Sequence, residues 1–240
     1  MTHQEVVARP VLTVVLCEAR AASDAQRRLE RGLADALAAR PDVAFAVLPH
    51  LYDLAPGGPA VQFLQSIPGP LAVLGWLYPR AAYWVLHANG IEDRPDRIIR
   101  CFDLRGQGEG AEVLAEIDRI CIPHTGCAGC VTIEETVVPR WYPVIDQRRC
   151  TNCLECLNFC LFGVFGLDNS GKVFVEQPDA CRDGCPACSR ICPPGAIMFP
   201  EHPDPAIAGG AIAGDSFAPP THQEGDGLDR LIDELDESDL

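Results

Sequence analysis

The sequence contains no apolar run as long as a membrane helix requires and no recognisable secretion signal. The apolar stretch near the start, residues 11–17, is about a third of the roughly 20 residues that cross a bilayer. The first residues also lack the charged start and the small-residue cleavage site of a signal peptide. We therefore expect neither membrane insertion nor secretion.

Basic residues are also scarce. The 240 residues include 19 Lys and Arg against 34 Asp and Glu, which gives a net charge of −15. Such a surface repels the phosphates of nucleic acids and anionic lipid headgroups. The composition argues against nucleic acid and membranes as partners, and it favours partner proteins with basic docking surfaces.

Cysteine, by contrast, is abundant, with 13 residues, and two groups of four stand out. The first group is spaced C-x2-C-x2-C-x3-C and comprises Cys150, Cys153, Cys156 and Cys160. The second is spaced C-x3-C-x2-C-x3-C-P and comprises Cys181, Cys185, Cys188 and Cys192. A cubane iron–sulfur cluster takes four thiolates. Three can come from one tight loop, and the fourth comes from elsewhere in the fold.

Two other uses of eight cysteines fit the sequence less well. Disulfide frameworks belong to small secreted chains, and zinc ribbons use separated C-x2-C pairs rather than triplets followed by a fourth cysteine. An iron–sulfur protein needs its cysteines reduced, so we expect a reducing compartment, the cytoplasm.

The doubled run resembles that of the two-cluster bacterial ferredoxins, over about residues 139–200. In that family the fourth cysteine of each run ligates the other cluster. The resemblance implies a small α+β domain in which one [4Fe–4S] cluster is held by Cys150, Cys153, Cys156 and Cys192. It implies a second [4Fe–4S] cluster held by Cys181, Cys185, Cys188 and Cys160.

The repeat extends beyond the cysteines. CLFGVF at 160–165 echoes CPPGAI at 192–197, and VIDQRRC at 144–150 echoes VEQPDAC at 175–181. Two copies of one short unit predict a pseudo-twofold domain in which neither half buries its apolar face alone. Between the copies, residues 168–171 predict a hairpin turn that ends on Gly171.

The sequence departs from the ferredoxin pattern in two places. Leu161 stands where a proline usually follows the fourth cysteine, and residues 182–184 insert one extra residue into the second run. Neither change removes a thiolate. Both affect backbone geometry beside a cluster, which is a determinant of reduction potential.

The first half of the chain alternates between strand and helix patterns. Continuous apolar runs predict buried strands at 11–17, 43–49, 70–77 and 97–104. Amphipathic segments predict helices at 23–40, 59–67, 79–88 and 111–122. This alternation predicts an α/β domain over residues 1–130, with a parallel sheet of the flavodoxin or Rossmann type. Its family is not identifiable from the pattern.

The loops of this domain carry no convincing cofactor signature. The first strand–helix loop, residues 17–23, has no glycine, which a dinucleotide requires there. The glycine-rich segment 106–110 follows the fourth strand and includes a glutamate that would repel phosphate. Glu18, His50 and Asp103 lie near strand ends but form no obvious acid–base pair. The sequence argues against a flavin.

A third metal site is a separate hypothesis. Cys121, Cys127 and Cys130 are spaced C-x5-C-x2-C around His124, and Cys101 or Cys17 is a candidate fourth ligand. The group suits a third cluster, or a zinc ion that uses His124. Free cysteine also packs as a small hydrophobe, so idle thiols are the alternative.

The remaining segments complete the predicted organisation. Residues 131–200 form the ferredoxin domain, beginning with a strand at 131–139, and 201–240 form a Pro-, Gly- and Ala-rich linker and an acidic tail. Leu228, Leu231, Ile232 and Leu235 give the tail one apolar stripe. It is either a solvated tail or a helix that docks on a partner.

These features favour electron transfer through two [4Fe–4S] clusters, by a ferredoxin-like carrier or a subunit of an oxidoreductase complex rather than a stand-alone catalyst. One alternative is an iron–sulfur oxidoreductase whose first domain binds a flavin or nucleotide. Another is a redox or iron sensor that binds its partner only when the clusters are intact.

Overall fold

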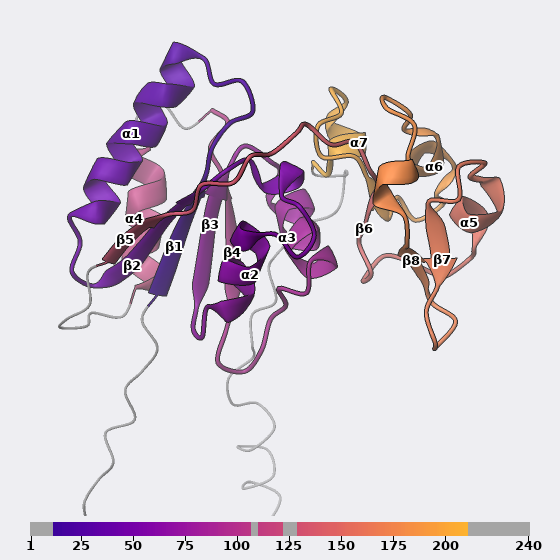
Figure 1. Ribbon diagram of the computed structural model, residues 1–240, viewed down its shortest axis with the longest axis horizontal. Coiled ribbons are helices and arrows are strands. Elements are labelled where there is room, and N and C mark those ends of the chain that lie inside the picture. Colours follow the sequence, from indigo (N-terminus) through magenta and orange to yellow (C-terminus); the bar gives the residue numbers. More distant parts are fainter. Residues whose placement is uncertain (1–11, 107–109, 122–128, 211–240) are drawn as a thin grey trace, which may run out of the picture.

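The computed structural model describes residues 12–106, 110–121 and 129–210, which form two lobes (Figure 1). The sheet lobe comprises residues 12–132, and the cysteine lobe comprises residues 144–210. An extended segment, residues 133–143, connects them. No helix within the described ranges is both long and apolar enough to cross a membrane. The predicted tail helix lies outside the described residues.

A five-stranded parallel sheet forms the centre of the sheet lobe. Its strands are β1 (Leu12–Cys17), β2 (Val43–Leu48), β3 (Leu71–Gly75), β4 (Ile99–Asp103) and β5 (Gly129–Thr132), in the order β4-β3-β1-β2-β5. The order of β1 to β4 is that of a flavodoxin-like sheet, in which the fifth strand follows β4. Here β5 lies beside β2 instead, at the opposite edge.

Helices cover both faces of this sheet (Figure 1). They are α1 (Asp24–Ala38), α2 (Pro59–Ser66), α3 (Pro79–Ala88) and α4 (Ala111–Ile120), with a short 3-10 helix, η1 (Leu51–Asp53), after β2. The side chains of β1 alternate between two cores. Val15 packs with α2 and α3, and Val14 and Leu16 pack with α1 and α4. The predicted α/β architecture is therefore confirmed.

Local signals account for the ends of these helices. Ser23 accepts a hydrogen bond from the Gln26 N–H, and the Gln26 side chain accepts one from the Ser23 N–H. This capping box satisfies two backbone donors that the first turn of α1 would otherwise expose. Pro59 and Pro79 begin α2 and α3, where a missing N–H costs nothing.

The strand predicted at 131–139 differs from the observed one. β5 begins at Gly129 and ends at Thr132, and it pairs with residues 44–47 of β2 in the sheet lobe. Beyond it the Ile133 N–H still donates to the Val47 carbonyl, and Glu135 accepts a hydrogen bond from the Ala60 N–H at the start of α2, at 3.1 Å. The alternation of apolar and polar side chains in residues 131–139 thus reflects packing along one edge of the sheet lobe.

The cysteine lobe is built from two similar halves. The first contains β6 (Val144–Ile145), α5 (Glu155–Phe159) and β7 (Phe165–Leu167). The second contains β8 (Val173–Val175), η2 (Pro178–Ala180), α6 (Ala187–Ile191) and β9 (Ile197–Met198). The predicted hairpin joins β7 to β8, and its Gly171 has a φ of 78°.

The two halves exchange strands. β6, which precedes the first cysteine run, pairs with β9, which follows the second. β8 precedes the second run and pairs with β7, which follows the first. The bond from the Asp146 N–H to the Ala196 carbonyl in one pair matches that from the Gln177 N–H to the Val164 carbonyl in the other. The predicted pseudo-twofold repeat is therefore present in the backbone.

Residues 201–210, expected as linker, form a short helix that packs on the lobe. In α7 (Pro205–Ala208), Asp204 caps the Ala206 N–H and Pro205 opens the first turn. The Phe199 N–H donates to the Ile207 carbonyl, and Ile207 is buried beside β9. Ile207 and Ala208 are both buried, so the segment is packed against the protein rather than extended into solvent.

The two lobes share a continuous core. Tyr142 of the connecting segment and Met198 of the cysteine lobe pack with α2 and α3 in the sheet-lobe core that contains Val15. Tyr52 and Tyr142 stack with ring centroids 4.3 Å apart, and each hydroxyl donates to the backbone carbonyl of the other residue. The two hydrogen bonds are buried and run in both directions across the junction, which favours one fixed arrangement of the lobes.

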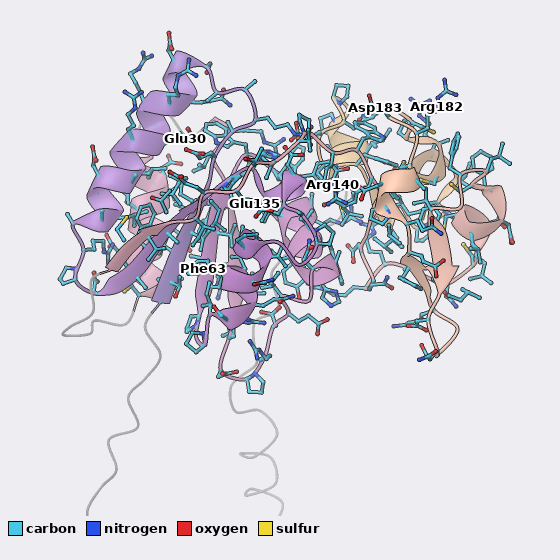
Figure 2. All side chains as sticks on the ribbon, in the orientation of Figure 1. Glu30, Phe63, Glu135, Arg140, Arg182 and Asp183 are labelled. Atoms are coloured by element: carbon cyan, nitrogen blue, oxygen red, sulfur yellow. The ribbon has the colours of Figure 1, made fainter. Side chains whose placement is uncertain are left out.

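An ion network around Asp53 reinforces the junction. Arg20, which follows β1, donates to the Asp53 carboxylate and to the Arg140 carbonyl. The Arg140 N–H donates to Asp53 at 2.8 Å, and Arg140 lies where the lobes meet (Figure 2). Burial alone would raise the pKa of Asp53. Hydrogen bonds from His50, Arg20 and Arg140 outweigh it, so this pKa is lowered.

The Asp53 network predicts an acid-sensitive contribution to stability. Because its folded-state pKa is below the unfolded one, ionised Asp53 stabilises the fold fully above about pH 4 and loses that effect as the pH falls through the folded pKa. Asp53→Asn should therefore have a lower free energy of unfolding than wild type at pH 7. This difference, the stability margin, should narrow below about pH 4. Urea unfolding followed by circular dichroism between pH 7 and 3 measures this margin.

Asp118→Asn is the matched control, because the Asp118 side chain is 63% exposed and pairs with Arg40 at the surface. We expect a small margin there at every pH. A margin for Asp53→Asn that stayed constant down to pH 3 would contradict the role given to Asp53.

Candidate metal centre

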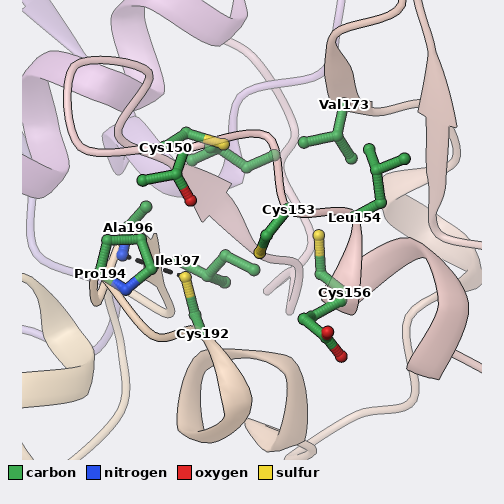
Figure 3. Close-up of a pocket in the computed structure, with 12 residues that line it drawn as sticks. Cys150, Cys153, Leu154, Cys156, Val173, Cys192, Pro194, Ala196 and Ile197 are labelled. Carbon is green, nitrogen blue, oxygen red and sulfur yellow. Dashed lines mark hydrogen bonds between the residues drawn. The ribbon is translucent and has the colours of Figure 1, made fainter.

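Four cysteines line one pocket of the cysteine lobe (Figure 3). Three of them come from the first run and the fourth from the second: Cys150, Cys153, Cys156 and Cys192. Their sulfur atoms surround a shared space, and Ile145, Val173 and Ile197 supply apolar walls. The Cys192 sulfur also accepts a hydrogen bond from the Ala196 N–H at 3.3 Å.

The other four cysteines of the two runs line a second pocket. They are Cys181, Cys185 and Cys188 of the second run and Cys160 of the first. This pocket has a volume of about 390 Å³ and is walled by Val164 and Phe165, among other apolar side chains. The structure therefore groups the eight cysteines in the two sets that the sequence resemblance implies.

Strand exchange explains this grouping. Because β9 pairs with β6, the turn that carries Cys192 lies beside the loop that follows β6. Because β7 pairs with β8, the turn that carries Cys160 lies beside the second run. Gly163 and Gly195 have φ values of 66° and 60°, so each turn uses the left-handed region that glycine adopts without strain.

The first cysteine loop is held in an unusual backbone conformation. Asn152 and Leu154 have φ values of 55° and 64°, a region that costs a residue with a side chain about 1–2 kcal/mol. Asn152 compensates because its side chain donates to the Gly171 carbonyl and accepts from the Val173 N–H. The loop is thereby fastened to the hairpin. This role was not predicted from the sequence, although an asparagine between cysteines is a recognisable signal for left-handed backbone.

The pockets disfavour thiolates that lack a cation. Burial, and then repulsion from Cys150 and Cys192, raises the pKa of Cys156 to about 11. Burial, and then repulsion from nearby thiolates that include Cys160, raises the pKa of Cys188. Four converging thiolates become favourable when metal charge offsets their repulsion, and metal binding then displaces the protons.

The donor set suits a cluster better than a single ion. Within the described ranges every cysteine is free of disulfide bonds, and no three His, Cys, Asp or Glu side chains converge on one ion. A cubane instead takes each thiolate to a different iron. The first pocket has about 10 Å³ of free volume between its lining side chains.

Both departures from the ferredoxin pattern lie at the surface. Leu161 is 93% exposed, and Phe159 and Phe162 on either side of it are 48% and 44% exposed. These three side chains form an apolar patch that borders the second pocket. Arg182 and Asp183 point into solvent (Figure 2). Neither departure displaces a cysteine from its pocket.

Trp141 makes two contacts beside the second pocket. Its indole N–H donates to the Cys185 carbonyl at 3.2 Å, and its ring stacks on Phe199 with centroids 5.1 Å apart. Trp141 thus connects the segment between the lobes to the second cysteine run.

The third predicted metal site is only partly within the described residues. Cys127 and His124 lie outside them. Cys130 lies on β5 and Cys101 on β4, at opposite edges of the sheet, and Cys121 hydrogen-bonds to Asp42. A site that includes Cys130 would therefore not draw on Cys101, and the third site stays a prediction.

Two of the polar residues near the strand ends, Asp103 and His50, lie beside charged side chains. Asp103 pairs with Arg105. His50 is buried between Asp53 and Glu201, which belongs to the cysteine lobe. Burial, and then repulsion from Glu30, raises the pKa of Glu18. The sheet edge where α/β proteins usually bind ligands is thus occupied in part by the other lobe.

The role of Asn152 predicts an ordered series of variants. Asn152→Gly keeps the backbone conformation but loses two side-chain hydrogen bonds, so we expect a loss of about 1 kcal/mol in unfolding free energy. Asn152→Ala also introduces left-handed strain and should lose about 1 kcal/mol more. Urea unfolding of the purified protein measures both. Equal losses would show that backbone conformation at Asn152 contributes nothing.

Comparisons with known proteins support a ferredoxin-like region. No family model matches the chain. The chain is 47% identical over 66 residues to an uncharacterised ferredoxin of Methanocaldococcus jannaschii, which covers 27% of the chain and 44% of that protein. It is 42% identical over 69 residues to an indolepyruvate oxidoreductase subunit of Methanothermobacter marburgensis, covering 28% of the chain and 10% of that subunit.

A third relative is a pyruvate synthase subunit of Methanocaldococcus jannaschii. It is 34% identical over 55 residues, which are 23% of the chain and 62% of that subunit. The chain spans less than two thirds of each of these relatives. Over about a quarter of its length, it is therefore similar to a ferredoxin and to subunits of oxidoreductases.

Proposed function

We propose that this chain transfers electrons through two [4Fe–4S] clusters held in the cysteine lobe. The supporting observation is the division of eight cysteines into two pockets, each completed by a cysteine from the other run. One cluster would be held by Cys150, Cys153, Cys156 and Cys192. The other would be held by Cys181, Cys185, Cys188 and Cys160.

The cluster supplies one-electron chemistry, and the chain supplies its environment. Apolar side chains such as Val173 and Phe165 exclude water from the pockets. The Ala196 N–H donates to the Cys192 sulfur, and such bonds stabilise a more negative, reduced cluster. In this proposal the protein itself carries out no reaction on a substrate.

The sheet lobe would support the cysteine lobe and help to select its partner. Its shared core with Tyr142 and Met198 holds the two lobes together. Two of the similar proteins are subunits of oxidoreductases, so we propose a carrier or a subunit that exchanges electrons with such complexes. We propose three domains, residues 1–130, 131–200 and 201–240, with residues 131–132 completing strand β5 of the first.

The surface beside the second pocket suits contact with a redox partner. The apolar patch of Phe159, Leu161 and Phe162 is exposed on both sides of Cys160. A partner docked there would exclude water next to the cluster. The net charge of −15 would attract partners with a basic surface.

The exchanged ligands predict which cysteine variants behave alike. Cys153→Ala and Cys192→Ala should remove the same cluster, although the two residues belong to different runs. Cys185→Ala and Cys160→Ala should remove the other. Each variant should retain about four of the eight irons that two cubane clusters contain. Iron analysis and electron paramagnetic resonance of the reduced, anaerobically purified protein measure this.

Cys101→Ala is the control, because Cys101 lies in the sheet lobe and should be dispensable for both clusters. Loss of the same signal in Cys153→Ala and Cys160→Ala would contradict the exchange. Loss of iron in Cys101→Ala would instead support a further site in the sheet lobe.

Electron transfer should depend on salt and on the apolar patch. The anaerobically reduced protein should reduce cytochrome c, a basic one-electron acceptor, with a rate constant that falls about tenfold between low and high salt. Leu161→Asn should lower this rate constant several-fold without loss of iron. Stopped-flow absorbance of cytochrome c measures it.

Val138→Asn is the matched control, because Val138 is also an exposed apolar side chain, at 74%, but lies in the segment between the lobes. We expect no change there. Clusters that cannot be reversibly reduced would contradict electron transfer itself. Equal rates in wild type and Leu161→Asn would contradict only the docking patch.

A further inference from the structure

An arginine of the sheet lobe hydrogen-bonds to the turn beside the first cysteine pocket. Arg80 lies in the first turn of α3, and its side chain is 5% exposed. Its Nε donates to the Asp146 carboxylate at 2.7 Å, and its Nη2 donates to the Gly195 carbonyl at 2.8 Å. Both acceptors belong to the cysteine lobe, so this cation crosses the junction between the lobes.

The carbonyl that Arg80 binds belongs to the peptide group that faces a cysteine sulfur. Gly195 contributes the C=O of this group, and Ala196 contributes its N–H, which donates to the Cys192 sulfur at 3.3 Å. A cation at the carbonyl end polarises the peptide and strengthens the N–H as a donor. Arg80 and the Cys192 sulfur are thus connected through a single peptide unit.

Asp146 connects the same arginine to the other side of the pocket. Its carboxylate accepts from the Arg148 N–H at 3.0 Å, and its backbone carbonyl accepts from the Cys150 N–H at 3.0 Å. Asp146 is 3% exposed, and a buried carboxylate depends on its cation partner. The Arg80–Asp146 pair therefore fixes the loop before Cys150 and the turn after Cys192 together.

The arrangement is specific to one of the two pockets. In the repeat, Asp146 corresponds to Gln177, which carries no charge, and the Gly195–Ala196 peptide corresponds to Gly163–Val164. The charged pair is therefore a feature of the first pocket and not of the repeated unit. The second pocket provides an internal reference for its effect.

We propose that Arg80 is a positioning residue that raises the reduction potential of the cluster in the pocket of Cys150, Cys153, Cys156 and Cys192. This inference rests on the proposed function. Reduction adds negative charge to a cluster, and both a nearby cation and a polarised N–H donor stabilise that charge. The sheet lobe would then act on electron transfer by separating the potentials of the two clusters.

The test is a redox titration monitored by electron paramagnetic resonance on the full chain, purified without oxygen. The two signals are assigned with Cys153→Ala and Cys185→Ala. In Arg80→Met the potential of the first cluster should become more negative, while that of the second stays at its wild-type value. In Arg80→Lys the charge remains but a single ammonium replaces the two-pronged contact, so a smaller shift is expected.

Arg149→Met is the matched control. Arg149 donates to the Pro194 carbonyl. The N–H of the same peptide group belongs to Gly195, and it donates to the Cys192 carbonyl oxygen rather than to the Cys192 sulfur. Loss of this cation should shift the first potential less than loss of Arg80. Equal shifts of the first potential in Arg149→Met and Arg80→Met would overturn the inference that Arg80 acts through the Gly195–Ala196 peptide group.

Circular dichroism and iron content separate redox effects from misfolding. If Arg80→Met fails to retain iron, Arg80→Lys provides the test. Two reversible clusters whose potentials are the same in wild type and the Arg80 variant would overturn this inference alone, as would equal shifts in both clusters. A wild-type protein without reversible clusters would overturn the proposed function and this inference with it.

Discussion

The exchange of strands between its two halves is the constraint on which the cysteine lobe depends. β6 pairs with β9 and β7 with β8, so each half completes its partner's sheet rather than its own. The same exchange carries the last cysteine of each run into the other pocket. Each pocket therefore takes its fourth cysteine from the other half, so both pockets belong to one folded unit.

The two lobes are coupled because the cysteine lobe buries its strands β6 and β9 against the sheet lobe. Two-residue strands such as β6 and β9 are marginal alone, and Val144 and Met198 gain stability by packing against α3 in the core of the sheet lobe. The Tyr52–Tyr142 stack and the Arg80–Asp146 pair add desolvated polar contacts at the same junction. A change in the sheet lobe can therefore reach the cysteine pockets through a few short connections.

Electrostatics acts at two scales in this molecule. Over long distances, the charge of −15 would steer basic partners toward the protein. Within the pockets, burial raises cysteine pKa values such as that of Cys156, so the thiolate form requires metal charge nearby. Exposed apolar residues such as Leu161 separate these two environments. The protein thus combines a net negative charge with two apolar-walled cysteine pockets, of which the second is bordered by an exposed apolar patch.

The sequence by itself determined the features that depend on near neighbours. Apolar runs and amphipathic segments placed β1 to β4 and α1 to α4, and Gly171 marked a turn that needs left-handed backbone. Pairing over long distances was decided only by the tertiary structure. Residues 129–132 pair with β2 at the edge of the sheet, and Arg80 meets Asp146 because α3 packs on β6. Local pattern carries no information on which distant partner a buried group will find.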